Sequence, residues 1–272
     1  MVCYTISMRL SYSALSTFNQ CPLKYKWQYV ERIKVPPTQD LFFGSLVHNT
    51  LEFALKNDPV VQPIGKLIEY YQAKWNPKVF KDDISEKEYF NAGVEMLKTF
   101  HSSHTPGLTT ILNIEKFFEI PWQGHVIVGK IDRIDRLPTG ELEIIDYKTN
   151  KKLPGEDDFK FDLQLPLYRW AAQTLVSDSN NIKLTLYFLR HNKRLTPINL
   201  KSLDQLQKYI LDSVEAIQSS KFEAKPSKLC GWCEYLFQCE AGKKYLTKKQ
   251  KDGETEKPRN NGFPRDSLFS NL

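Results

Sequence analysis

The segment 142-LEIIDYKTN-150 ends an apolar run with a carboxylate and an ammonium group two residues apart. Its start, LEII, predicts a buried strand that leads directly to Asp146 and Lys148. Because side chains alternate between the two faces of a strand, Asp146 and Lys148 lie on one face and Tyr147 on the other. Such a pair is either an ordinary salt bridge at a strand end or part of a metal-dependent active site.

A second carboxylate, Asp132, lies upstream in 129-GKIDRID-135 and shares a strand face with Val126 and Val128. A short turn between two neighbouring strands would bring Asp132 close to Asp146. Two carboxylates that close repel each other unless a cation lies between them, and hard oxygen ligands favour Mg²⁺ or Mn²⁺. Lys148 beside such an ion would stabilise developing charge or position a water nucleophile.

Two predicted helices add polar side chains to this set. His48 ends the segment 44-GSLVH-48, and Gln164 and Tyr168 lie one turn apart on one helix face in 164-QLPLY-168. Taken singly, a helix histidine is more often structural, and a glutamine–tyrosine pair is unremarkable. These residues become candidates only through their order along the chain with the two strand motifs.

The elements that must position these residues alternate between helices and strands. Apolar periodicity predicts helices over 11–32 (interrupted at Cys21-Pro22), 43–56, 63–75, 85–100, 161–176 and 202–218. The fourth helix opens with 85-SEKE-88, a capping-box pattern. Strands are predicted over 110–121, 125–136, 141–148 and 182–190, with a hairpin turn at Gln123-Gly124. A three-strand meander, a crossover helix and a further strand indicate an α/β fold.

The composition predicts a globular protein with a sizeable core, because 41% of the 272 residues are apolar and 12% are aromatic. No apolar run approaches the ~20 residues that span a membrane, and the N-terminus lacks the pattern of a secretory signal. We therefore expect a cytoplasmic protein without a membrane partner.

Residues 1–9 are expected to be a disordered start. The tail 241–272 holds eight basic and four acidic residues, so it carries +4 of the net charge of +6. We expect this tail to be disordered and either solubilising or in loose contact with phosphates.

The chain has five cysteines, Cys3, Cys21, Cys230, Cys233 and Cys239. The last three form a C-x2-C-x5-C pattern, which in an intracellular protein suggests a metal site before a disulfide. Three thiolates are one short of a closed tetrahedral set. Cys21 is the natural fourth because it lies in a helical segment with apolar neighbours, whereas Cys3 precedes any periodic sequence. Spacing alone does not separate zinc from an iron–sulfur cluster.

In this order, the motifs GSLVH, GKIDRID, IIDYKT and QLPLYRWA resemble the RecB-type branch of the PD-(D/E)XK nuclease superfamily. The opening 11-SYSALSTFNQCPLKYKWQYV-30 resembles the N-terminal helix of that branch, and the match runs from about Leu10 to Cys239. The resemblance implies a restriction-endonuclease-like αβββαβ core with N-terminal helical additions and a C-terminal iron–sulfur segment. The nuclease domain would span 10–240, with a helical insertion over about 58–105.

The resemblance also implies roles for individual residues. It makes metal ligands of His48, Asp132, Asp146 and the backbone carbonyl of Tyr147. It makes Lys148 the catalytic lysine, and it places Gln164 and Tyr168 along the site, where they orient Lys148 or the DNA strand. Asp135 would be a supporting residue, and Glu115, on the preceding strand, is too weak a candidate to include. Cys21 with the C-terminal triplet is similar to the [4Fe–4S] clasp of AddB-type and CRISPR-associated nucleases.

These roles imply an exonuclease that uses Mg²⁺ or Mn²⁺ on single-stranded DNA ends. Its partners would be DNA, with single-stranded or duplex ends, and a helicase or other proteins of recombination, repair, phage replication or CRISPR adaptation. One alternative is a catalytically inactive nucleic-acid-binding module, or a helicase-partner subunit, with a structural zinc or iron–sulfur site. Another is an unrelated zinc protein whose motif order is coincidental. The intact set of His48, Asp132, Asp146 and Lys148 argues against a binding module, which has no need of it.

Overall fold

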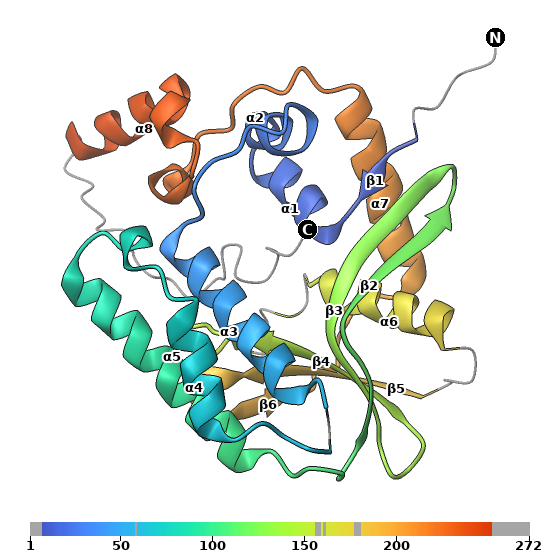
Figure 1. Ribbon diagram of the computed structural model, residues 1–272. Coiled ribbons are helices and arrows are strands. Elements are labelled where there is room, and N and C mark those ends of the chain that lie inside the picture. The colour runs from blue at the N-terminus through green and yellow to red at the C-terminus, as the bar shows by residue number, and fades with distance from the viewer. Residues whose placement is uncertain (1–6, 58, 156–158, 160–161, 177–180, 252–272) are drawn as a thin grey trace.

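A mixed sheet of six strands forms the centre of the computed structural model, which describes residues 7–57, 59–155, 159, 162–176 and 181–251 (Figure 1). The strand order is β1-β3-β4-β5-β6, with β2 paired to β3. The strands are β1 Arg9–Leu10, β2 Thr110–Trp122, β3 His125–Arg136, β4 Leu142–Lys148, β5 Ile182–Phe188 and β6 Lys193–Leu195. Strand β4 runs antiparallel to β3 and parallel to β5. The predicted α/β class is confirmed.

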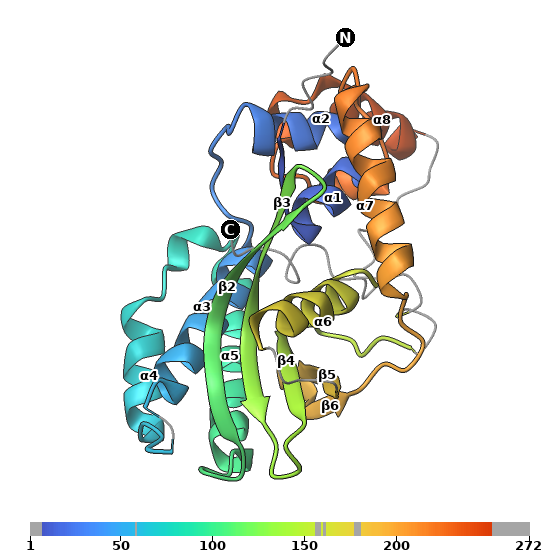
Figure 2. The same cartoon turned by 90° about the vertical axis from the view of Figure 1, so that its right-hand side faces the viewer.

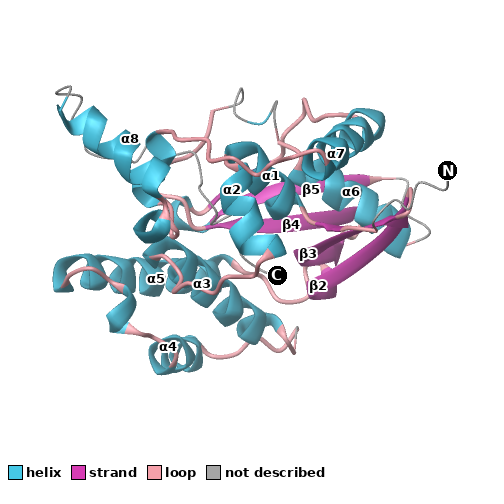
Figure 3. Cartoon of the chain, turned by 90° about the horizontal axis from the view of Figure 1, so that it is seen from above, coloured by secondary structure: helices cyan, strands magenta, loops and turns pink. Residues whose placement is uncertain are grey.

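Helices cover both faces of this sheet and bury a separate apolar core on each (Figures 2 and 3). On one face lie α1 Tyr12–Gln20, α2 Pro22–Tyr25, α6 Gln164–Leu175 and α7 Leu203–Gln218. On the other face lie α3 Gln39–Leu55, α4 Ile64–Ala73 and α5 Asp83–Ser103. Strand alternation divides β4 between the two cores, since Ile144 belongs to the first and Ile145 to the second. No helix within the described residues is long and apolar enough to cross a membrane.

The hairpin of β2 and β3 turns where the sequence predicts. Gln123 and Gly124 both have positive φ, of 49° and 77°, as a tight two-residue hairpin turn requires. Trp122 pairs with His125 across the turn, and this register continues along both strands as far as Asn113 and Ile134. The turn therefore fixes which residue of β2 lies opposite each residue of β3.

Several local predictions need correction. Helix α5 begins at Asp83 and is capped by Asp82, whose carboxylate accepts the N–H of Ser85 at 2.7 Å, so the predicted capping box at 85–88 is wrong. Residues 26–30, predicted as part of an ordinary helix, form a π-helical turn after α2. Strands β1 and β6 were not predicted, because two or three residues are too few to show a period.

Both predicted ends of the ordered chain also need correction. Arg9 pairs with Val126 in β1, and the Val126 N–H donates to the Met8 carbonyl at 2.9 Å, so the fold begins before residue 10. At the other end, Glu240–Lys251 forms α8 where an unstructured tail was predicted. This segment is polar in composition, but its buried Gly242 lies against Leu236 and anchors the helix. Residues 1–6 and 252–272 lie outside the described residues.

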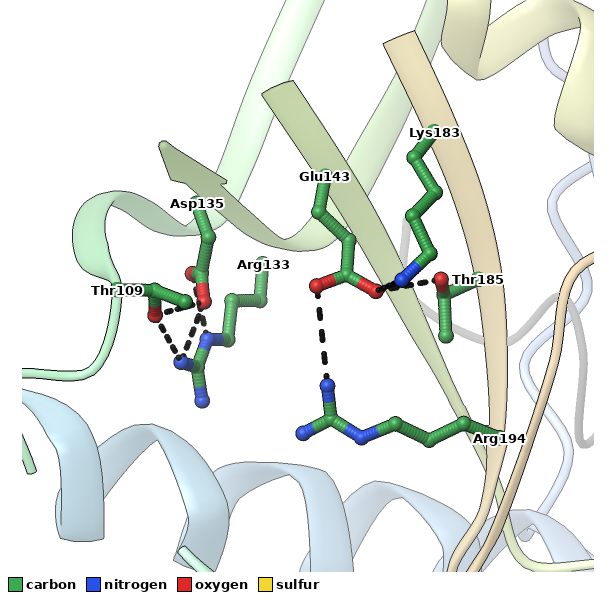
Figure 4. Close-up of polar contacts among 7 residues, drawn as sticks. All are labelled: Thr109, Arg133, Asp135, Glu143, Lys183, Thr185 and Arg194. Carbon is green, nitrogen blue, oxygen red and sulfur yellow. Dashed lines mark hydrogen bonds and ion pairs between the residues drawn. The ribbon is translucent and has the colours of Figure 1, made fainter. Parts of the chain in front are cut away.

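A buried ion pair on the face that α3, α4 and α5 cover braces β3 (Figure 4). Arg133 donates from Nε and Nη2 to the two oxygens of Asp135 at 2.6 and 2.5 Å. The Thr109 hydroxyl, in the segment after α5, donates to the same carboxylate at 2.6 Å. A charge can be buried this deeply only because both partners are paired and hydrogen-bonded.

A second network on the same face joins β4 to β5 and β6 (Figure 4). Glu143 accepts a hydrogen bond from Thr185 at 2.6 Å and lies 3.0 Å from the Lys183 ammonium and 3.7 Å from the Arg194 guanidinium. Asp135 and Glu143 are Cα partners on adjacent strands, so each carboxylate needs its own cation to prevent repulsion.

We expect Asp135→Ala to lower the free energy of unfolding by about 3–5 kcal/mol, because it leaves the Arg133 guanidinium buried without its carboxylate partner. Urea unfolding followed by circular dichroism measures the loss. Lys208→Ala, which breaks an exposed ion pair with Asp212 on α7, is the control and should leave stability nearly unchanged. Equal losses in the two variants would show that the Arg133–Asp135 pair does not brace the sheet.

Candidate active site

The site lies where β3 and β4 stop pairing. Their register ends at Arg133 opposite Ile145, so the next residues, Asp132 and Asp146, lie opposite each other. Tyr147 N–H donates to Oδ2 of Asp132 at 2.7 Å, which links the two strands through a side chain. Both aspartates are buried, with 5% and 3% of their surface exposed. The predicted approach of the two carboxylates is therefore present in the structure.

Helix α3 brings His48 to the same point. Its Nδ1 lies 3.4 Å from Oδ1 of Asp132. The imidazole packs edge-on against the ring of Tyr147, with 5.9 Å between ring centres. Because the Tyr147 ring points away from Asp146 and Lys148, this contact fixes His48 against the side of β4 that faces α3.

Helix α6 supplies a hydrogen-bonded chain from the opposite layer. The Lys148 ammonium contacts the Asp146 carboxylate and donates to Oε1 of Gln164 at 3.1 Å. Nε2 of Gln164 in turn donates to the Tyr168 hydroxyl at 2.7 Å. The structure thus brings together all six predicted side chains, which are those of His48, Asp132, Asp146, Lys148, Gln164 and Tyr168.

Glu115 also belongs to this site, although its sequence signal was too weak to include it. Its Oε1 lies 3.9 Å from Nδ1 of His48, and the ligand atoms of Glu115, His48 and Asp132 all lie within 4.8 Å of one another. Its φ of 49° is unusual for a glutamate within a strand, and the cost of such strain is characteristic of functional sites. The hairpin turn could have revealed it, because a turn at Gln123-Gly124 places Glu115 opposite Asp132.

Burial and like charge shift the protonation of the acids. Burial raises the pKa of Asp146 to about 7; the Lys148 ammonium opposes this shift and Asp132 adds to it. Burial also raises the pKa of Glu115, and the neighbouring Asp132 adds to that shift. For Asp132, burial acts in the same direction, but His48, the Tyr147 N–H and Lys148 together outweigh it and hold the pKa below its ordinary value. Asp146 and Glu115 therefore bind protons more readily than Asp132 does.

His48 carries the compensating charge when no metal is bound. Burial alone would lower its pKa, but Asp132 raises it most strongly, and with Glu115 and Asp146 it brings the pKa to about 9. At neutral pH the imidazole is therefore a cation held between carboxylates. Its Nδ1 nevertheless has no hydrogen-bond partner among the described residues.

This donor set suits a hard divalent cation. One imidazole nitrogen and the carboxylates of Asp132 and Glu115 converge in a buried space, and the buried Asp146 lies on the strand beside Asp132; such oxygen-rich sets favour Mg²⁺ or Mn²⁺. A bound divalent ion would replace the proton on His48 and neutralise the acids. The residues present therefore fit the metal that the resemblance implies.

Comparison with known proteins agrees with this geometry. Residues 9–240 match the sequence profile of the PD-(D/E)XK nuclease superfamily. The chain belongs to this nuclease superfamily. It is 30% identical over 180 residues to a subunit of the ATP-dependent helicase/deoxyribonuclease of Streptococcus agalactiae, covering 62% of this chain and 16% of that protein. The protein of the same name from Streptococcus pyogenes is 26% identical over 223 residues, covering 75% of this chain and 20% of that protein.

This chain therefore spans at most a fifth of the length of these two relatives. Among solved structures, it is similar to a "Putative exonuclease" from Eubacterium rectale, with a TM-score of 0.52, 12% identity and coverage of 87% of both chains. That likeness concerns the fold alone. It confirms the restriction-endonuclease-like architecture that the motif order predicts.

Four of the five cysteines of this PD-(D/E)XK chain meet in one pocket away from the acids. Cys21, Cys230, Cys233 and Cys239 line it together with apolar side chains and Gly242, and all four are free thiols. Backbone N–H groups donate to sulfur in each case. The donors are Lys225 to Cys21 at 3.5 Å, Ser227 to Cys230 and Gly242 to Cys239 at 3.3 Å, and Tyr235 to Cys233. Cys3 lies outside the described residues.

The raised pKa of His48 predicts a pH-dependent stability of the metal-free nuclease domain. A histidine whose pKa rises from 6.5 to about 9 on folding adds stability that is full below pH 6.5 and is lost as pH rises through 9. The loss should be roughly 3 kcal/mol. Urea unfolding in EDTA between pH 7 and 10 measures it; Asp146, with a pKa of about 7, is about half protonated at the start of this range and mostly ionised in the rest of it.

His48→Gln is the control, since it removes this titration. The stability difference between parent and variant should shrink steadily as pH rises. A difference that stays constant from pH 7 to 10 would mean that His48 is not protonated in the metal-free fold.

Proposed function

We propose that this member of the PD-(D/E)XK superfamily hydrolyses phosphodiester bonds in DNA with Mg²⁺ or Mn²⁺. The observation that carries the proposal is the junction of β3 and β4, where His48, Asp132 and Asp146 converge beside Lys148. The streptococcal relatives, which are named as ATP-dependent helicase/deoxyribonuclease subunits, support the same chemistry. A module that only binds DNA would need neither a buried acid pair nor a lysine held against it.

In this proposal the ligands of the metal are His48, Asp132, Asp146 and the backbone carbonyl of Tyr147, with Glu115 as an additional carboxylate. The ion would polarise the phosphate and lower the pKa of a bound water. Lys148 would place its ammonium against the charge that develops on the phosphate. Gln164 holds that ammonium, and Tyr168 holds the amide of Gln164, so the lysine is oriented before substrate arrives.

We further propose that the substrate is a single-stranded DNA end and that the chain acts as an exonuclease with a helicase partner. The streptococcal relatives are named as a subunit of an ATP-dependent helicase/deoxyribonuclease, and this chain corresponds to a small part of their length. A helicase would supply single strands that the nuclease then shortens. End-labelled single- and double-stranded DNA, with Mg²⁺, Mn²⁺ or EDTA, distinguishes this activity from cleavage of duplexes and from binding alone.

Asp146→Ala and Lys148→Ala should each abolish cleavage and leave the fold intact. The first removes a proposed metal ligand and the second removes the charge next to the phosphate. Cleavage of labelled DNA measures activity, and circular dichroism measures the fold. Lys183→Ala is the matched control, because Lys183 also pairs with a buried carboxylate but on the opposite face of the sheet. Cleavage within about twofold of the parent in either site variant would show that the active site is assigned wrongly.

We also propose that the cysteine pocket holds a [4Fe–4S] cluster. A single zinc ion with ~2.3 Å bonds would draw four sulfurs within about 3.8 Å of one another. Among the described residues, however, the group that converges within 4.8 Å is His48, Glu115 and Asp132, not the cysteines. The wider spacing suits a polynuclear cluster, and N–H donors to each sulfur are the kind of contact that stabilises such clusters.

Cys21→Ser should therefore cost the cluster and much of the stability, whereas Cys3→Ser should be almost silent. Cys21 already faces the C-terminal cysteines in the pocket. Iron content and visible absorbance near 400 nm, measured anaerobically, test both variants. Iron lost from Cys3→Ser but kept in Cys21→Ser would reverse the assignment, and iron absent from the parent would refute the cluster.

A further inference from the structure

Arg190 lies at the carboxyl edge of the sheet, two residues beyond the end of β5. The last residue of β5, Phe188, is the Cα partner of Lys148 at the end of β4. Nε of Arg190 donates to the Thr149 carbonyl at 3.5 Å, so the guanidinium lies beside the residue that follows Lys148. In open α/β sheets, ligands bind outside the carboxyl ends of parallel strands. Arg190 is therefore next to the place where a substrate strand would lie.

Aromatic side chains of the helical layer support this guanidinium. Its central carbon lies 5.8 Å from the centre of the Phe43 ring. Phe43 packs edge-on against Tyr89 at 5.1 Å, and the Lys151 ammonium lies 4.9 Å from the centre of the Tyr89 ring. Two cations from the loops after β4 and β5 thus rest on a pair of touching rings.

Arg190 has no carboxylate within ion-pairing distance among the described residues. The acid of this region, Asp40, instead accepts the hydroxyl of Tyr89 at 2.5 Å. Burial of the guanidinium lowers the pKa of Arg190 although Tyr89, Asp40 and Tyr71 act in the opposite direction, so these groups compensate its charge only in part. Arg194, four residues later, differs: it also lies over a ring, that of Tyr187 at 4.8 Å, but has Glu143 at 3.7 Å.

A second polar group near Arg190 is also unsatisfied. Tyr71 is fully buried, and its hydroxyl has no hydrogen-bond partner among the described residues. This hydroxyl occupies the space that a Cβ on Gly93 would need. The positive charge of Arg190 opposes the rise in the Tyr71 pKa that burial causes. A half-buried cation without an ion-paired carboxylate costs free energy that an anionic ligand would offset.

We propose that Arg190, with Lys151 beside it, binds a backbone phosphate of the DNA strand next to the phosphate that lies at Lys148. The planar guanidinium fork matches two phosphate oxygens, and the aromatic rings leave its outer N–H groups available. This inference rests on the proposed nuclease function. It assigns a strand-binding role to a residue outside the metal site and outside the four sequence motifs.

The test is the affinity of the full chain for a fluorescent single-stranded oligonucleotide in EDTA, where no metal-dependent cleavage occurs. Arg190→Gln should weaken binding about tenfold, as the loss of one charge-assisted contact does. It should also reduce the slope of log affinity against log salt by about 0.7. Arg194→Gln, which removes the same charge from a carboxylate-paired arginine over a ring, is the matched control and should change affinity less than twofold.

A scan of single methylphosphonate linkages locates the contact. One neutral linkage should weaken binding of the parent and of Arg194→Gln, but should have no further effect on Arg190→Gln. Thermal unfolding separates binding from structure: Arg190→Gln should be as stable as the parent or more stable, since an uncompensated charge is removed. Arg190→Lys should keep the salt slope while losing part of the affinity.

Equal affinities for Arg190→Gln and Arg194→Gln would overturn the inference, as would an unchanged methylphosphonate pattern. An effect that requires a terminal phosphate would exclude the backbone contact. In all of these cases the parent still binds and cleaves DNA. A parent that neither binds nor cleaves would refute the proposed function itself.

Discussion

The burial of like charges on adjacent strands is the constraint on which the rest of this structure depends. Asp132 and Asp146 oppose each other on β3 and β4, and Asp135 and Glu143 oppose each other three residues away on the other face. Buried carboxylates this close repel unless cations separate them. Strands β3 and β4 supply only part of this positive charge, so the neighbouring strands β5 and β6 and the helix α3 supply the rest. His48 comes from α3 and Lys183 and Arg194 from β5 and β6, while Lys148 and Arg133 come from β4 and β3 themselves.

The two faces of the sheet compensate their buried carboxylates in different ways. The networks on one face stabilise the fold, whereas the residues on the other face form the proposed active site. Behind the sheet, two short hydrogen bonds give both carboxylate oxygens of Asp135 a donor from Arg133, although Nη1 of Arg133 has no hydrogen-bond partner among the described residues, and Glu143 has a hydroxyl and two cations. At the site, His48 Nδ1 lacks a hydrogen-bond partner among the described residues, and the Asp146 carboxyl has a pKa raised to about 7. A closed pair fixes geometry, whereas an incomplete one retains affinity for a cation. The closed networks therefore hold the strands in the register that keeps the open site assembled.

Sequence periodicity predicted the part of the site that lies within strands. Alternation placed Asp146 and Lys148 on one face. The turn at Gln123-Gly124 fixes the pairing register of β2 and β3, which places Glu115 opposite Asp132. Sequence periodicity does not predict how a helix packs against a sheet. The contact of His48 with Asp132 and that of Gln164 with Lys148 depend on packing of α3 and α6, and only the resemblance to a family suggested them. The π-helical turn at 26–30 and helix α8 depend on tertiary contacts in the same way.

The cysteine pocket and the acid site are connected through α3, although they lie in different parts of the fold. The Tyr235 hydroxyl, between Cys233 and Cys239, donates to the Ile33 carbonyl at 2.9 Å, and Lys24 pairs with Glu234 at 3.0 Å. These contacts fasten the segment that leads from α2 into α3, the helix that carries His48. They involve neither a thiol nor an acid of the site, so protein contacts alone already hold this segment against the end of the chain that carries the cysteines. A cluster in the pocket would then strengthen an anchor that exists without it, and its effect on the metal site would be transmitted through the position of His48.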